Sequence, residues 1–284
     1  MSITSGELEP RMMDIRGAKL YVEERGTGPV LLCISGGPTD AGMFTDLAGR
    51  LADRYTVVSY DQRGHSRSTL GGEAADISVE SHADDAAALL EAVGDEPAYV
   101  YGNSGGGTIG LDLVTRRPEL VTTLVAHEPP LLEILPDVDA WRARWADIYK
   151  TYEAEGAFPA MGMFGAAVEE GGPKYSEEMQ QAPPTPEGEE MGNRMMGNFD
   201  LFLAQELRSI SEYDPDFDTL RRVSTNVVSA AGETSGEQLA RLAAIELASR
   251  LGKEPAYLPG AHGGWGSDPQ EFASRLEGLL RSGS

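Results

Sequence analysis

A serine in the segment Gly102-Asn103-Ser104-Gly105-Gly106 is the residue of this chain best suited to nucleophilic chemistry. It follows an apolar run that ends at Tyr101 and precedes a segment with Ile109 and Leu113 at helical spacing. A serine between a buried strand and a helix is held in a strained turn, and flanking glycines avoid the collisions that a Cβ would cause. We therefore predict that Ser104 is a nucleophile whose hydroxyl both a base and a substrate can reach. A phosphate-binding loop is disfavoured, because no Lys-Ser/Thr pair follows.

Acyl transfer also needs N–H donors for the oxyanion of its tetrahedral intermediate. In this type of turn the backbone N–H of Gly105, the residue after the serine, supplies one donor. The loop Ser35-Gly36-Gly37-Pro38-Thr39 follows an earlier apolar run, and we expect the N–H of Gly37 to supply the second. The alternative interpretation of this loop is an ordinary Gly-Pro turn.

The general base is selected from four histidines. His262 follows the last apolar run in a glycine-rich loop, and the chain order serine, acid, histidine places the base last. His65, in a turn after the second apolar run, is expected to have a structural or cap-contacting role. His82, in the first turn of a helix, is expected to be solvated. We therefore predict that His262 is the base.

Two carboxylates compete for the role of the acid that orients the base. In most chains of this arrangement the acid is an aspartate after the penultimate strand, but Ser235 occupies that position here. Glu233, two residues earlier, is one candidate. Glu128 is the other, because it follows the apolar run 123–126 and would lie at a carboxy-terminal strand end. A triad is defined by geometry rather than by chain position, so the sequence favours Glu128 and leaves Glu233, or no carboxylate, as alternatives.

Short apolar runs that alternate with helical segments must position these residues. This alternation predicts an α/β protein with a mostly parallel central sheet flanked by helices. One helix is expected to begin at Ser81 and end at Gly94, and the C-terminal segment is predicted to be another amphipathic helix. The predicted strands are 30–34, 56–60, 98–101, 123–126, 226–230 and 255–258.

Residues 131–220 show no convincing strand, so we predict an inserted helical cap there, with residues 1–130 and 221–284 forming the core domain. A proline-rich stretch at 180–188 is expected to be an exposed loop or a mobile lid. Aromatic and thioether side chains of the cap offer a soft surface for a bulky, neutral, hydrophobic substrate, although packing within the cap is the competing explanation. The predicted substrate-binding residues are Trp141, Trp145, Tyr149, Met161 and Met163.

Composition limits the classes of partner. The formal charge is −23, and the cap alone holds six basic and 19 acidic residues. Such a field repels nucleic acids, anionic membrane surfaces and polyanionic substrates, so we expect none of these as partners. The single Cys33 excludes a disulfide framework, and we expect no metal and no cofactor. The N-terminal residues lack a basic and apolar leader pattern, which predicts a cytoplasmic location; the sequence leaves the oligomeric state open, a homodimer included.

Four segments, taken in order, resemble the α/β-hydrolase superfamily across nearly the whole chain, and this resemblance implies the α/β-hydrolase fold. They are Ser35-Gly36-Gly37-Pro38, Asp61-Gln62-Arg63-Gly64-His65-Ser66, Gly102-Asn103-Ser104-Gly105-Gly106 and the loop of His262. The nearest detailed match is the zearalenone hydrolase type of lactonase, whose acid is a glutamate after the sixth strand. The similarity lies in the pair His127-Glu128 and in the turn from Asp61 to Ser68, which ends in Ser66-Arg67-Ser68. The resemblance implies that Ser104 attacks a lactone or ester carbonyl, that His262 takes its proton and that Glu128 orients His262.

The sequence thus predicts a serine hydrolase, carboxylesterase-like or lactonase-like, that cleaves an ester or lactone through an acyl-enzyme. Two alternatives stay open. The same triad could hydrolyse a carbon–carbon, amide or carbamate bond, because the fold does not separate these reactions. A non-catalytic ligand-binding protein could also keep the hydrolase shell, although such proteins usually lose the serine or the histidine.

Overall fold

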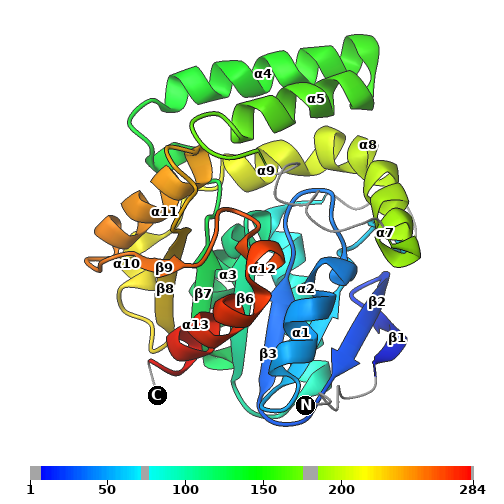
Figure 1. Ribbon diagram of the computed structural model, residues 1–284, viewed down its shortest axis with the longest axis vertical. Helices are drawn as coiled ribbons and strands as arrows, with labels where there is room; N and C mark the ends of the chain where they lie inside the picture. The colour runs from blue at the N-terminus through cyan, green and yellow to red at the C-terminus, as the bar shows by residue number, and fades with distance from the viewer. Residues whose placement is uncertain (1–7, 72–76, 175–184, 283–284) are drawn as a thin grey trace.

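A computed structural model describes residues 8–71, 77–174 and 185–282 of the chain. Part of the predicted proline-rich loop, residues 180–184, lies outside these ranges. The described residues form an α/β-hydrolase fold, with a mostly parallel sheet between two layers of helices (Figure 1). The fold class predicted from the sequence is therefore confirmed.

The nine-stranded sheet has the order β1-β2-β4-β3-β6-β7-β8-β9, with the short β5 (Thr69–Leu70) beside β2. All six predicted strands are present with small changes at their ends, and they pair in parallel. They are β3 (Val30–Ile34), β4 (Thr56–Tyr60), β6 (Ala98–Asn103), β7 (Val121–His127), β8 (Asn226–Gly232) and β9 (Ala256–Leu258). The sequence analysis missed β1 (Glu9–Ile15) and β2 (Ala18–Arg25), which form an antiparallel hairpin at one edge.

A layer of helices packs against the apolar side chains on each face of the sheet. On one face the helices are α1 (Thr45–Leu51) and α13 (Pro269–Arg281), and buried Leu47 and Leu276 belong to the same apolar cluster. On the other face they are α2 (Val79–Val93), α3 (Gly105–Arg116) and α11 (Leu239–Arg250). The N-cap of α2 is Ser78, three residues before the predicted Ser81, because Ser78 and Ser81 form the capping box of this helix. Cys33 is fully buried in β3, and burial raises the pKa of its thiol to about 12.

The described part of residues 131–220, which we refer to as the cap segment, is largely helical, and its first two α-helices lie over one end of this core (Figure 1). These two helices, α4 (Val138–Glu155) and α5 (Ala157–Val168), pack against each other. The chain then continues through α7 (Pro186–Gly197), α8 (Phe199–Leu201), a π-helical turn (Phe202–Glu206), α9 (Leu207–Ser211) and α10 (Phe217–Leu220). Among the described residues, no helix combines the length and the apolar character needed to cross a membrane.

A buried carboxylate attaches the cap segment to the core. Oε1 of Glu206 lies 3.1 Å from Nε2 of His65 and 3.1 Å from Nε2 of His82, and all three side chains are almost completely buried. The expectation that His82 is solvated is therefore wrong, because Glu206 provides a partner for it inside the protein. The cap-contacting role expected for His65 is confirmed.

The pKa values of Glu206 and His65 depart from the ordinary values of these groups. Burial alone would raise the pKa of Glu206, but the two histidines outweigh burial and lower it to about 2. Burial alone would lower the pKa of His65, but the charge of Glu206 and the hydrogen bond to it, with smaller contributions from Thr39 and Asp61, together outweigh burial and the pKa is raised. A lowered carboxyl pKa stabilises the fold above the ordinary value of 4.5, and a raised imidazole pKa stabilises it below 6.5.

We therefore expect Glu206→Gln to destabilise the protein most between pH 4.5 and 6.5, with a smaller effect on either side of this window. Urea unfolding at a series of pH values measures the free energy of unfolding of both proteins. Glu212→Gln, at an exposed residue nearby, is the matched control. A difference between wild type and Glu206→Gln that does not change with pH would contradict this prediction.

Candidate active site

Ser104 lies in the turn between β6 and α3, at the amino end of the helix. Its backbone has φ 54° and ψ −126°, a strained conformation for a residue with a side chain. The turn is tight because a Cβ on Gly106 would lie 2.0 Å from the carbonyl oxygen of Ile34, so glycine is required there. This strand–turn–helix geometry holds the Ser104 hydroxyl at the surface of a cavity, as the sequence pattern predicts.

Glu128 and His262 form a short hydrogen bond beside this turn. Nδ1 of His262 lies 2.7 Å from Oε2 of Glu128, whose side chain is completely buried. The other carboxylate oxygen, Oε1, accepts a hydrogen bond of 2.8 Å from the backbone N–H of Gly232. Glu128 directly follows β7 and has a positive φ of 50°, so the chain turns sharply where this side chain enters the site. The carboxylate thus fixes the orientation of the imidazole.

The hydrogen bond keeps Glu128 ionised in spite of its burial. Burial alone would raise the pKa of this carboxyl group, but the hydrogen bond from His262 and the charge of that ring outweigh it. The pKa of Glu128 falls to about 2. An ionised carboxylate at Nδ1 leaves Nε2 as the nitrogen that can accept a proton, and it stabilises the imidazolium that results.

The competing acid, Glu233, lies outside this arrangement. Its side chain is 47% exposed, and its carboxylate lies 3.9 Å from the guanidinium of Arg275. Ser235, at the position where such chains usually carry the acid, is buried. Of the two carboxylates that the sequence left open, Glu128 is therefore the one in contact with His262.

Two further polar residues, Asn103 and His127, lie beside His262, and neither was predicted to have a role. Nδ2 of Asn103 donates a hydrogen bond of 3.2 Å to the backbone carbonyl of His262. His127 is fully buried, and its Nδ1 lies 3.0 Å from the hydroxyl of Tyr101. Burial lowers the pKa of His127 to about 4, so its ring stays neutral near neutral pH. Asn103 directly precedes Ser104, and His127 directly precedes Glu128. This proximity in sequence was the only signal that could have indicated their place beside the site.

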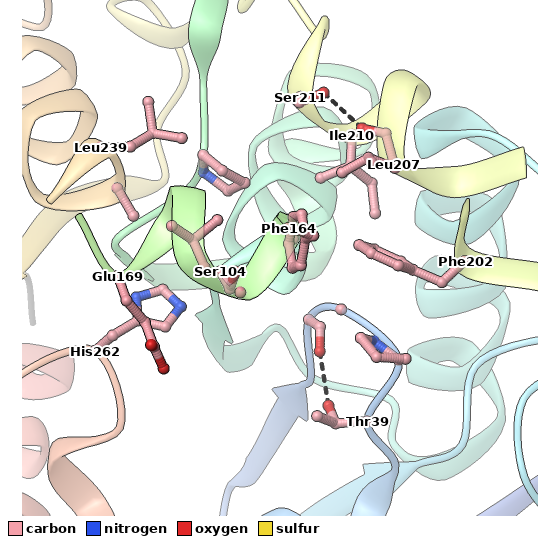
Figure 2. A pocket seen from close by; sticks show the side chains of 18 of the residues that line it. Thr39, Ser104, Phe164, Glu169, Phe202, Leu207, Ile210, Ser211, Leu239 and His262 are labelled. Atoms are coloured by element: carbon pink, nitrogen blue, oxygen red, sulfur yellow. Dashed lines mark hydrogen bonds between the residues drawn. The ribbon is translucent and has the colours of Figure 1, made fainter. Parts of the chain in front are cut away.

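A cavity of about 250 Å³ opens above Ser104 and His262 (Figure 2). Gly37 and Gly105, the predicted oxyanion donors, also line it. The cap segment supplies most of the opposite wall, which is largely apolar. Among the described residues of the lining, Glu169 is the only acidic side chain, and none is lysine or arginine. The apolar side chains of that wall include Trp145, Met161, Phe164, Val168, Met195, Phe199, Phe202, Leu207 and Ile210.

The structure places two of the five predicted substrate-binding residues at this cavity, namely Trp145 and Met161. The other three do not line it. Trp141 packs edge-on against Trp145 with ring centroids 5.7 Å apart, and the Arg208 guanidinium covers the ring of Tyr149 at 4.2 Å.

Met163 is 40% exposed, and its Sδ accepts a hydrogen bond of 3.2 Å from Oγ1 of Thr151 on α4. Trp141, Tyr149 and Met163 are therefore not lining residues of this cavity, because the aromatic residues of α4 and the methionines of α5 do not all direct their side chains toward it. Within the described ranges, no group of three His, Cys, Asp or Glu side chains is arranged to hold a metal ion.

The fold and the site together define the class of protein. Residues 29–200 match the family model described as alpha/beta hydrolase fold, so the chain belongs to this family. It is 35% identical to the uncharacterized hydrolase YraK of Bacillus subtilis over 99% of this chain and 97% of that protein.

It is also 34% identical to a 2-(acetamidomethylene)succinate hydrolase of Mesorhizobium japonicum, over half of each chain. A thermophilic esterase from Thermogutta terrifontis has a similar structure, with a TM-score of 0.73 at 18% identity over 97% of this chain and 99% of that chain. The protein is therefore a hydrolase of the α/β-hydrolase family.

We expect Glu128→Gln to slow the reaction of Ser104 by about 10⁴-fold, since an amide at this position neither holds the required tautomer nor stabilises the imidazolium. The rate of labelling by a fluorophosphonate, with the modified peptide identified by mass spectrometry, measures this effect. Glu233→Gln is the matched control and should label at the wild-type rate. Equal loss in the two variants would contradict the role of Glu128.

Proposed function

We propose that this protein is a serine hydrolase that cleaves an ester or lactone of a bulky, neutral, hydrophobic molecule through an acyl-enzyme. The observation that carries this proposal is the Glu128–His262 hydrogen bond beside the strained Ser104, at the floor of an apolar cavity. These groups match the nucleophile, base and orienting acid that acyl transfer needs.

In the first half-reaction the Ser104 hydroxyl attacks the carbonyl carbon while Nε2 of His262 takes its proton. The negative charge moves to the carbonyl oxygen, where the N–H groups of Gly37 and Gly105 donate hydrogen bonds. The intermediate then collapses to the acyl-enzyme, and the leaving alkoxide receives the proton from His262. Water repeats these steps on the acyl-enzyme, so that the acid is released and Ser104 regains its proton.

The lining of the cavity supports an uncharged substrate. A carboxylate brought into an apolar wall loses hydration, which only a basic or hydrogen-bonding partner would offset. The described lining offers no lysine or arginine to such a group. The position of Glu128 after β7 further supports the lactonase of the zearalenone hydrolase type as the nearest model for the acid.

The second candidate is hydrolysis of an amide, carbamate or carbon–carbon bond by the same residues. It is favoured by the similarity to the Mesorhizobium hydrolase, whose name gives it a succinate substrate. That similarity spans half of the chain, and a succinate carries two carboxylates for which the described lining offers no basic partner. The ester or lactone is therefore the better supported substrate class.

We expect the wild type to hydrolyse neutral p-nitrophenyl butyrate and octanoate, and Ser104→Ala to lose at least about 10³-fold in kcat/KM. The p-nitrophenyl hemisuccinate, of similar size but anionic, should react at least about tenfold more slowly than the butyrate. Release of p-nitrophenol measures the rates with the three substrates and the rates of wild type and Ser104→Ala.

Product mass then separates the candidate reactions on larger substrates. Opening of a lactone adds one water and gives a single product, whereas cleavage of an amide, a carbamate or an acyclic diketone gives separate fragments. No hydrolysis and no fluorophosphonate labelling by folded wild type would overturn the proposal and favour a non-catalytic ligand-binding protein.

A further inference from the structure

The loop that carries the Gly37 N–H lies directly against the nucleophile. A Cβ on Gly36 would lie 2.5 Å from the backbone nitrogen of Gly105 and 2.7 Å from Cβ of Ser104. Gly37 itself has a φ of +59°, a conformation that glycine adopts easily and also leaves easily. The direction of its N–H therefore depends on contacts made by the residues around it.

The first of these contacts comes from within the loop. Oγ1 of Thr39 donates a hydrogen bond of 2.7 Å to the carbonyl oxygen of Gly36. This carbonyl and the N–H of Gly37 belong to the same trans peptide plane, in which they point in opposite directions. A partner on the carbonyl side therefore restrains the direction of the N–H on the other side.

The second contact comes from the cap segment. Asn198, at the carboxyl end of α7, is 4% exposed and makes three hydrogen bonds with the core. Its Nδ2 donates to the carbonyl oxygen of Pro38 at 2.9 Å and to Oγ of Ser66 at 2.9 Å. Its Oδ1 accepts from the backbone N–H of Ser66 at 2.8 Å. The side-chain amide thus joins the Gly37 loop to the turn after β4.

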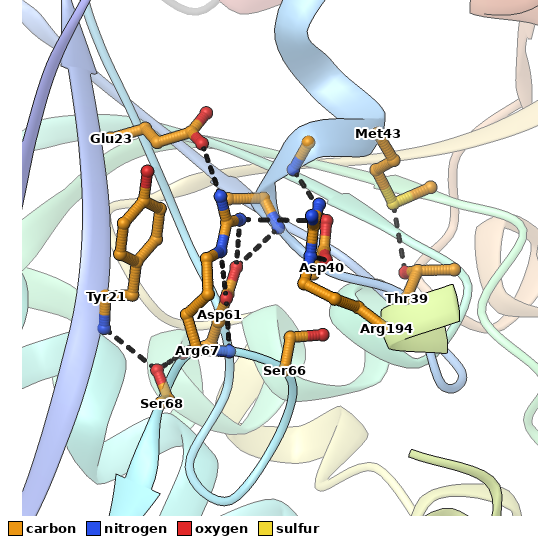
Figure 3. A network of polar contacts seen from close by, with 12 residues as sticks. Tyr21, Glu23, Thr39, Asp40, Met43, Asp61, Ser66, Arg67, Ser68 and Arg194 are labelled. Carbon is orange, nitrogen blue, oxygen red and sulfur yellow. Dashed lines mark hydrogen bonds and ion pairs between the residues drawn. The ribbon is translucent and has the colours of Figure 1, made fainter. Parts of the chain in front are cut away.

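An ion pair on the same helix holds the next part of the loop. Nε of Arg194 lies 2.6 Å from Oδ2 of Asp40, whose side chain is 1% exposed (Figure 3). Oδ1 of Asp40 accepts from the backbone N–H of Gly42, and Arg67 approaches it at 3.8 Å. Arg67 in turn is paired with Asp61, which also accepts from the N–H of Ala41. The cap segment therefore contacts the loop at two residues just after Gly37, namely Pro38 and Asp40.

From these contacts we propose that Asn198 is a positioning residue for the oxyanion hole. By holding the Pro38 carbonyl it fixes the backbone at Gly37 and hence the direction of the N–H that stabilises the tetrahedral intermediate. The cap segment then completes the catalytic site, in addition to forming the wall of the cavity. This inference rests on the proposed acyl-transfer function, since it concerns the oxyanion of that reaction. Asn198 itself does not line the cavity.

The test compares Asn198→Asp with wild type, because aspartate keeps the size and the acceptor for the Ser66 N–H but loses the donor to Pro38. Asn193→Asp is the matched control, since Asn193 is exposed on the same helix and the change of charge is identical. Ser66→Ala removes one partner of Asn198 and leaves the bond to Pro38. If Asn198→Asp does not fold, Asn198→Ala takes its place in the same comparison.

We expect Asn198→Asp to lower kcat for p-nitrophenyl butyrate by about tenfold to a hundredfold, less than the loss of a whole oxyanion donor, and to change KM by no more than about twofold. The affinity for a trifluoromethyl ketone, which forms a tetrahedral adduct with Ser104 and places an oxyanion in the hole, should fall in parallel. The affinity for the corresponding methyl ketone, bound without an adduct, should not change. Asn193→Asp and Ser66→Ala should retain kcat and both affinities.

Three outcomes would overturn the inference while leaving the proposed function intact. These are an unchanged kcat in Asn198→Asp, an equal loss of affinity for the two ketones, and an equal loss of kcat in Asn193→Asp. A wild type that neither hydrolyses the ester nor reacts with a fluorophosphonate would instead overturn the proposed function, and this inference with it.

Discussion

The close contact between the first turn of α3 and the end of β3 determines how the site is assembled. A side chain at Gly106 would collide with the Ile34 carbonyl, so only glycine lets the helix start so near the neighbouring strand. This contact brings the loop after β3 beside the serine after β6. The next strands in the sheet, β7, β8 and β9, then deliver Glu128, its Gly232 partner and His262 to the same edge. Parallel strands thus gather residues that are distant in sequence.

The parallel strands and the strained turn at Ser104 could be predicted because their signals are local. Each inner strand is a continuous apolar run. Ser104 lies between Gly102 and Gly106, in a pattern typical of a turn between a strand and a helix. The edge hairpin gives no such signal, since most of β1 is exposed and carries polar residues. The choice between Glu128 and Glu233 depended on a contact between distant segments, which spacing along the chain does not reveal.

The cap segment could be predicted as helical but not in its detailed packing. The π-helical turn at Phe202–Glu206 interrupts the ordinary helical period between α8 and α9. It places Phe202 and Leu207 at the cavity and directs Glu206 to the two buried histidines. A period of 3.6 residues read from the sequence does not anticipate this shift, so the partner of His82 was missed.

Cys33 gives the molecule a practical property. Its thiol is buried in the middle strand β3 with a pKa of about 12, so it is protonated and inaccessible to reagents under ordinary conditions. The natural chain therefore provides a background without reactive thiols. A cysteine introduced on α4 and another on α13 would accept spectroscopic labels selectively. The distance between the cap segment and the core could then be followed in solution without first removing a native residue.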